Sequence, residues 1–163
     1  MLVTSREKWK QFQLDYWDIY KAEFPAYVGK FDVHCQRGFL KESLGDYQRR
    51  YLKSDEFLGQ LADIRIDDLP DEDQVSYRLV HQELQQVREQ FELDGHLRLA
   101  ELFPSGPEMF ISYHGVDSVT LLSIDDACDY VVRMGQFSGL FSDVQQRLQK
   151  GLEKGYVLPA VLL

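Results

Sequence analysis

The first part of the chain carries apolar residues at helical spacing. Large side chains recur at steps of mainly three and four residues, at Trp9, Phe12, Tyr16, Trp17, Tyr20 and Phe24. This spacing predicts a long helix with one apolar side, and that side is expected to face a core. Thr4 and Glu7 have the spacing of a capping box, which predicts where the helix begins. Pro25 and Gly29 predict its end.

Two more helices are predicted in the middle of the chain. The second carries Leu40, Leu44, Tyr47 and Tyr51, and continues through Phe57, Leu58 and Leu61. Residues 54–56 read Ser-Asp-Glu, and because Ser and Asp favour helix caps we expect a break there. The third helix has the clearest period, with Asp94 and Gly95 at its end. Its apolar positions are Tyr77, Val80, Leu84, Val87 and Phe91.

An acidic connector, residues 63–73, joins these two helices. Its carboxylates resemble a calcium loop, but the glycine and the glutamate that such a loop requires at its sixth and twelfth positions are missing. Carboxylates also gather at helix starts, where the free N–H groups and the helix dipole favour negative charge. With Pro70 close to a first-turn position, the connector predicts a helix start and not a calcium site.

The segment from about 96 to 122 lacks helical periodicity. Residues 103–107 form a turn cluster, and residues 110–116 show no helical repeat. We therefore predict one long irregular loop, and loops of this length are often functional. Tyr113, His114 and Gly115 are the candidate substrate-contact residues of the chain.

The last part predicts two helices, so the chain is expected to be all-α, a bundle of about five helices forming one domain over 1–163. Ser123 and Asp126 have cap spacing. The fourth helix runs through Cys128, Val131 and Val132 towards Met134, with an interruption expected at 135 or 138. The fifth ends at Gly155 and carries Phe137, Leu140, Phe141, Val144, Leu148 and Leu152.

Composition and charge narrow the class of protein. Of 163 residues, 44% are hydrophobic and 28% are charged, which is ordinary for a globular domain. The net charge of −9 argues against nucleic acid as a partner, because it repels phosphate. Cys35 and Cys128 are expected to be two buried free thiols, and the alternative is one disulfide bridge between them. With no apolar stretch of signal-peptide or membrane-spanning length, the cytoplasm is the predicted location and no membrane partner is expected.

No catalytic motif is visible in the sequence. There is no H-E-x-x-H for zinc, no G-x-S-x-G for a serine nucleophile, and no glycine-rich phosphate loop. His81 precedes a glutamate by two residues but lacks a second histidine, and His34 with Cys35 lacks further ligands at suitable spacing. We predict no catalytic residue and no metal ligand in this chain, and therefore no complete enzyme.

Four segments, taken in order, resemble the start of a bacterial family called domain of unknown function 885, whose members are similar to gluzincin-type zinc metallopeptidases. The first is the aromatic helix running into residues 24–29. The second is the connector with its following helix, at 58–64 and 69–77. The third is the helix start at 124–130, and the fourth is the G-x-x-x-G ending before a proline at 148–159.

This resemblance implies that the chain is the N-terminal portion of a longer, all-helical zinc-dependent peptide hydrolase. The zinc and its ligands would lie in polypeptide beyond residue 163, and this region would be a non-catalytic part of the cleft wall or lid for a peptide substrate. The apolar C-terminus, residues 156–163, is expected to pack against the remainder of its own polypeptide or a second copy. The alternative is a stand-alone helical protein-interaction module or homodimer.

Overall fold

The protein is all-α, as predicted. The computed structural model describes residues 3–24, 38, 41–98 and 121–157. These contain five α-helices, two short 3-10 turns and no strand. The chain divides into two compact units, residues 1–20 with 45–96 and residues 21–44 with 97–163. The prediction of a single domain over 1–163 stays a prediction. The elements are α1 (Ser5–Glu23), α3 (Leu44–Ala62), η2 (Ile66–Asp68), α4 (Asp71–Glu92), η3 (Gly95–Leu97), α6 (Ile124–Gly135) and α7 (Phe137–Glu153).

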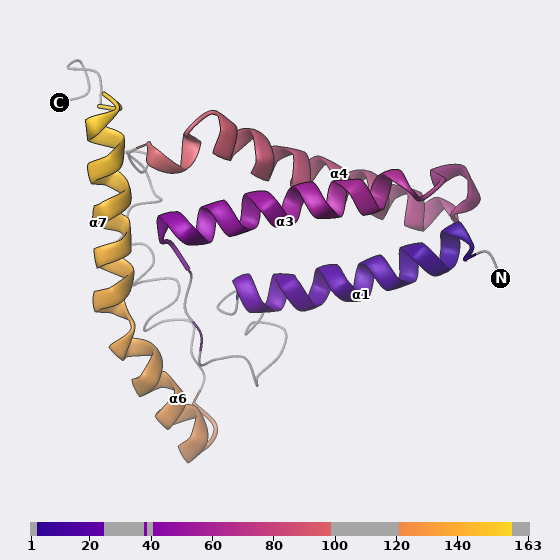
Figure 1. The fold of residues 1–163 in the computed structure, drawn as a ribbon. Coiled ribbons are helices and arrows are strands. Elements are labelled where there is room, and N and C mark those ends of the chain that lie inside the picture. The colour runs from indigo at the N-terminus through magenta and orange to yellow at the C-terminus, as the bar shows by residue number, and fades with distance from the viewer. Residues whose placement is uncertain (1–2, 25–37, 39–40, 99–120, 158–163) are drawn as a thin grey trace. The chain divides into compact units, whose positions relative to one another are not determined.

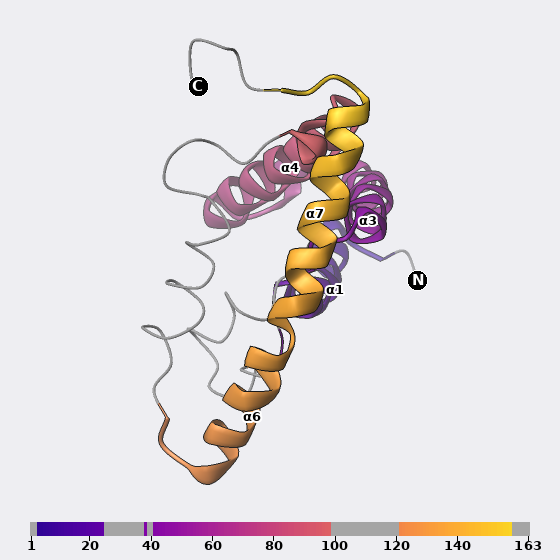
Figure 2. The same cartoon turned by 90° about the vertical axis from the view of Figure 1, so that its left-hand side faces the viewer.

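The first unit is a bundle of α1, α3 and α4, which lie side by side (Figures 1 and 2). The connector with η2 turns the chain back, so that α4 runs antiparallel to α3 (Figure 1). All three helices point their apolar sides inward, because separate amphipathic helices bury their apolar surface by packing on one another. The buried residues of this core are Trp9, Phe12, Phe57, Leu61, Ile64, Leu69 and Leu84.

Aromatic rings form much of that core. Trp9 is 1% exposed, and its ring stacks on Phe12, with 5.4 Å between the ring centroids. Phe57 of α3 meets Phe12 edge to face at 5.5 Å, an arrangement that aromatic quadrupoles favour. The predicted aromatic side of the first helix is therefore confirmed in its first half. Trp17 departs from it, because this side chain is 44% exposed.

Tyr16 links α1 to α4 at the edge of the core. Burial raises the pKa of its hydroxyl, and the charge of Glu83 with the hydrogen bond that Glu83 accepts raises this pKa further. Tyr77, on α4, makes a similar tie to α3, because its hydroxyl donates to the Leu61 carbonyl at 2.9 Å. Phenols that are buried with a polar partner hold two helices in one register.

An aromatic stack closes the other end of this bundle. His96, in η3, is buried, with the ring of Phe91 at 4.6 Å and the ring of Tyr47 at 5.4 Å. Tyr51 stacks on Phe91 at 4.7 Å, and the Arg50 guanidinium lies 4.3 Å from the centre of the Tyr47 ring. The stack fixes the chain as it leaves α4, where Asp94 has a left-handed φ of 55°.

The second unit contains α6 and α7. Figures 1 and 2 show α7 continuing from α6 with a bend, and Gln136 lies at the junction between the two helices. Leu140 and Val144 form its buried core with Phe24, Phe137 and Leu148 packed around them.

Two further contacts tie α7 to the rest of its unit. A Cβ added to Gly151 would collide with the carbonyl oxygen of Leu97, so the backbones approach closely and this position requires glycine. Arg147 pairs with Glu42 at 3.2 Å, and both side chains are largely buried.

Most helix boundaries agree with the sequence patterns, and two predictions are wrong. Helix α3 begins at Leu44, and the described residues 41–43 before it are not helical, so the second helix starts later than the predicted position at Leu40. The expected break at Ser54–Glu56 does not occur, and α3 runs through it. The Ser54 hydroxyl donates to the Tyr51 carbonyl at 2.7 Å, which satisfies this polar group within the helix and removes its need for a cap position. Of the predicted loop over 96–122, residues 99–120 lie outside the described residues.

Candidate interaction surface

The candidate substrate-contact residues Tyr113, His114 and Gly115 lie outside the described residues, as do His34 and Cys35. His81 is half-buried and stacks on Tyr77, with 6.1 Å between ring centroids. Within the part of the chain that the structure describes, no three His, Cys, Asp or Glu residues group as a metal site would require. The ring of His96 stacks on the rings of Phe91 and Tyr47, which is a packing contact within the first unit.

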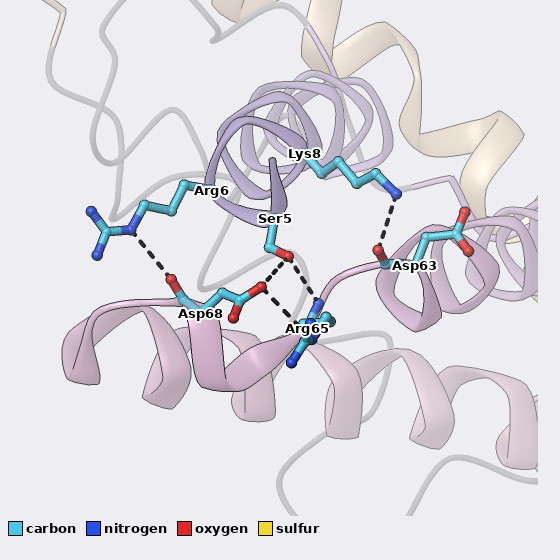
Figure 3. Close-up of polar contacts among 6 residues, drawn as sticks. All are labelled: Ser5, Arg6, Lys8, Asp63, Arg65 and Asp68. Carbon is cyan, nitrogen blue, oxygen red and sulfur yellow. Dashed lines mark hydrogen bonds and ion pairs between the residues drawn. The ribbon is translucent and has the colours of Figure 1, made fainter. Parts of the chain in front are cut away.

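The acidic connector is used to hold the start of α1 (Figure 3). The Ser5 hydroxyl donates to the Asp68 carboxylate at 3.0 Å and accepts from the Arg65 N–H at 3.4 Å. Arg6 Nε donates to the Asp68 carbonyl at 3.2 Å, and Lys8 Nζ donates to the Asp63 carbonyl at 3.1 Å. Three polar residues in the first turn of α1 thus contact the connector, and a structural function accounts for these groups.

The same end of α1 has the predicted capping box. The Thr4 N–H donates to the Glu7 carboxylate at 2.9 Å, and the Glu7 N–H donates to the Thr4 hydroxyl at 3.3 Å. The backbone and hydroxyl donors of Thr4 lower the pKa of Glu7, because they stabilise its ionised form. Trp9 Nε1 donates to Asp73 at 2.9 Å, so a carboxylate in the first turn of α4 also serves the fold. The interpretation of the connector as the start of a helix is confirmed, because α4 begins at Asp71.

Helix α6 is the one described α-helix without a buried apolar residue, and its branched aliphatic side chains are exposed. Ile124 is 84% exposed and Val131 is 69% exposed, and Val132 and Cys128 are exposed as well. At 100° per residue these four side chains lie on one side of the helix, within an arc of about 100°. We call this side the α6 outer surface and define it as Ile124, Cys128, Val131 and Val132.

The side of α6 opposite to the outer surface is the more polar one, and it faces the protein. Arg133 is 5% exposed, and burial lowers the pKa of its guanidinium. Asp126 and Tyr130 are half-buried. An amphipathic helix of a globular protein ordinarily buries its apolar side, so this inverted arrangement makes the α6 outer surface the candidate interaction surface of the described residues.

The start of α6 is fixed by two hydrogen bonds. The Ser123 hydroxyl accepts from the Asp126 N–H at 3.1 Å, as the cap prediction required. The Asp126 carboxylate in turn accepts from the Leu122 N–H at 2.9 Å. Leu121 and Leu122 are both exposed, so the apolar surface extends backwards from a backbone that is held in place.

The sequence contains a signal for this surface. Ile124, Cys128 and Val131 have the i, i+4, i+7 spacing of one helical side, and three aspartates lie in the first half of the helix. The pattern does not reveal that this side faces outward. The expectation that the cysteines are buried is wrong for Cys128, whose thiol is free and exposed.

No family model matches the chain, and searches of curated proteins and of solved structures find no match either. Across the described residues, no helix combines the length and the apolar character needed to cross a membrane.

Proposed function

We propose that this chain is a non-catalytic helical region whose α6 outer surface contacts a peptide. The observation that carries the proposal is the inverted polarity of α6, in which Val131 is 69% exposed while Arg133 is 5% exposed. Leaving branched aliphatic side chains in water costs free energy that a partner would recover, about 25 cal/mol for each Å² of apolar surface covered. A surface of this kind binds by shape and apolar contact.

The wider setting that we propose is a zinc-dependent peptide hydrolase in which this region forms part of the cleft wall or lid. The support is the ordered resemblance of the four sequence segments described above. No three potential ligands group together among the described side chains, so they do not fit a zinc ion, and the proposal assigns neither a metal ligand nor a chemical step to them. The cytoplasmic location belongs to the same proposal.

The contact function can be tested through Cys128, which lies on the α6 outer surface. A pool of amphipathic synthetic peptides is expected to slow the alkylation of Cys128 by iodoacetamide, followed by mass spectrometry. Val131→Ser should abolish this protection, because it removes an apolar group from the surface. The matched control is Leu79→Ser on α4, another exposed apolar residue, which should retain the protection. Protection that persists in Val131→Ser would contradict the proposal.

The absence of catalysis can be tested separately. Incubated with zinc and fluorogenic peptides, the purified chain is expected to show no hydrolysis. Zinc-dependent hydrolysis that is lost in His114→Ala or His34→Ala would overturn the assignment of a non-catalytic role.

The alternative function is a stand-alone interaction module that pairs with a second copy. The same exposed side chains favour it, since a homodimer would also cover them. Analytical ultracentrifugation separates the two readings. A monomer whose Cys128 is protected only by added peptide supports the first, and a dimer that Val131→Ser dissociates supports the second.

A further inference from the structure

The border of the α6 outer surface carries negative charge. Asp125 is exposed and lies next to Val132 around the helix, about 20° away at 100° per residue. Asp129 follows one turn later on the same border and is half-buried. The opposite border is formed by Ala127 and Met134, which are uncharged. Arg133, the one basic residue of α6, is on the buried side.

The middle of the surface is made of small residues. Cys128 and Gly135 lie along its centre line, with Ile124 and Val131 on one side and Val132 on the other. A Cβ built on Gly135 meets no atom within 4 Å. Large apolar side chains of a partner therefore have room to approach the helix backbone along the centre.

A second copy of this chain suits the surface poorly. Each copy has a net charge of −9. An antiparallel pairing of two α6 helices places the acidic border opposite itself, and a parallel pairing places it opposite the uncharged border. Neither arrangement gives the Asp125 carboxylate a positive neighbour, and like charges at a contact are unfavourable.

We propose that the α6 outer surface binds a peptide from another polypeptide chain, helical when bound, with large apolar side chains bordered by lysine or arginine. The inference rests on the proposed function and adds the chemical class of the peptide. The apolar side chains would cover Ile124, Cys128 and Val131, and the basic residues would lie beside Asp125. The charge complementarity selects this occupant over an acidic or uncharged one.

The experiment uses the chain with three synthetic peptides of about 18 residues, a length at which isolated helices become stable enough to bind as such. Two peptides share the same leucine positions and differ only in their border residues, lysine in one and glutamate in the other. The third is a scrambled form of the lysine peptide. Dissociation constants are measured by fluorescence anisotropy, and alkylation of Cys128 locates the binding site.

The lysine peptide is expected to bind more tightly than the glutamate peptide, to protect Cys128, and to weaken as salt is added. Asp125→Lys should weaken its binding roughly threefold to tenfold and reverse the preference, because an exposed attraction becomes a repulsion. Asp71→Lys is the matched control, since Asp71 is also an exposed aspartate in the first turn of a helix. This variant should change neither the affinity for the lysine peptide nor the preference for it over the glutamate peptide.

Several results would overturn the inference. Equal binding of the lysine and glutamate peptides at Cys128 would leave the proposed function standing and remove the charge selection. Failure of all peptides to protect Cys128 would contradict both the proposed peptide contact and the charge selection. Protection of Cys128 that rises with protein concentration alone would assign the surface to a second copy. Protection by phosphatidylglycerol vesicles, with none by the lysine peptide, would assign it to a lipid surface.

Discussion

Helices α1 and α6 have the same kind of sequence pattern and opposite environments. In α1, Trp9 and Phe12 are buried in a core to which α3 and α4 also contribute. In α6, Ile124 and Val131 lie in solvent, and Arg133 is buried. The comparison teaches that periodicity reports where a helix is apolar, whereas neighbouring elements decide which side is covered. A helix whose apolar side remains uncovered is the best place to look for a partner.

The strongest test of this comparison is a pair of tryptophans on one helix. Trp9→Ala is expected to lower the free energy of unfolding by about 3–5 kcal/mol, since it opens a cavity in the first core and leaves Asp73 without its indole donor. Trp17→Ala removes a side chain that is 44% exposed and should cost about 1 kcal/mol or less. Urea denaturation followed by far-UV circular dichroism measures both. Equal losses would mean that α1 does not have a buried and an exposed side.

The next effect sets two glycines of α7 against each other. Gly151→Ala is expected to destabilise the protein by roughly 1–3 kcal/mol, because its methyl group would meet the Leu97 carbonyl. Gly139→Ala has open space around its Cβ and should stabilise the helix by about 0.5–1 kcal/mol through a lower backbone entropy cost. Thermal unfolding of the two variants shows directly whether each substitution stabilises or destabilises the protein. A stabilising Gly151→Ala would show that the close approach to Leu97 does not exist in solution.

The tie between α1 and α4 predicts a dependence on alkaline pH. The pKa of Tyr16 is raised in the folded protein, so above about pH 10 the unfolded chain loses this proton while the folded chain keeps it. Stability is therefore expected to fall as the pH rises beyond that value. Tyr16→Phe should cost about 0.5–1.5 kcal/mol at neutral pH, from the lost hydrogen bond to Glu83, and should reduce the alkaline loss.

Denaturant titrations at neutral pH and at pH above 10 measure this difference between the parent chain and Tyr16→Phe. The control is Tyr20→Phe, which changes another tyrosine of the same helix and leaves the Tyr16 hydroxyl in place. An alkaline loss that is the same in the parent chain and in Tyr16→Phe would show that Tyr16 ionises as freely in the folded protein as in the unfolded one.

The smallest effect is expected on the α6 outer surface itself. Val131→Thr keeps the side-chain shape at an exposed position and should change stability by no more than about 0.5 kcal/mol. The same volume-conserving change at buried Val144 of α7 places a hydroxyl in the second core and should cost about 1–3 kcal/mol. Paired thermal melts of the two variants measure the contrast. A large loss at Val131 would mean that this surface is covered in the isolated chain.

Local sequence signals located most helices and their ends. Thr4 with Glu7 and Ser123 with Asp126 predicted two helix starts, and the structure shows the corresponding hydrogen bonds. These signals succeed because the groups involved lie within one helical turn. Ser54 carried the same kind of signal, but the helix break that it predicted does not occur, because its hydroxyl donates to the Tyr51 carbonyl inside the helix. The choice between the two outcomes depends on packing around Phe57 and Leu61, which no local pattern contains.

The sequence by itself determined that this protein is helical, acidic and built from amphipathic segments, because helical period and capping are local properties of the chain. Only the tertiary structure decided that Trp9 is buried and Trp17 is not, that Gly151 lies against a carbonyl, and that α6 presents Ile124 and Val131 to solvent. The physical reason is that burial depends on residues distant in sequence. Whether the apolar side of a helix is buried or exposed is decided only when another element packs against the helix.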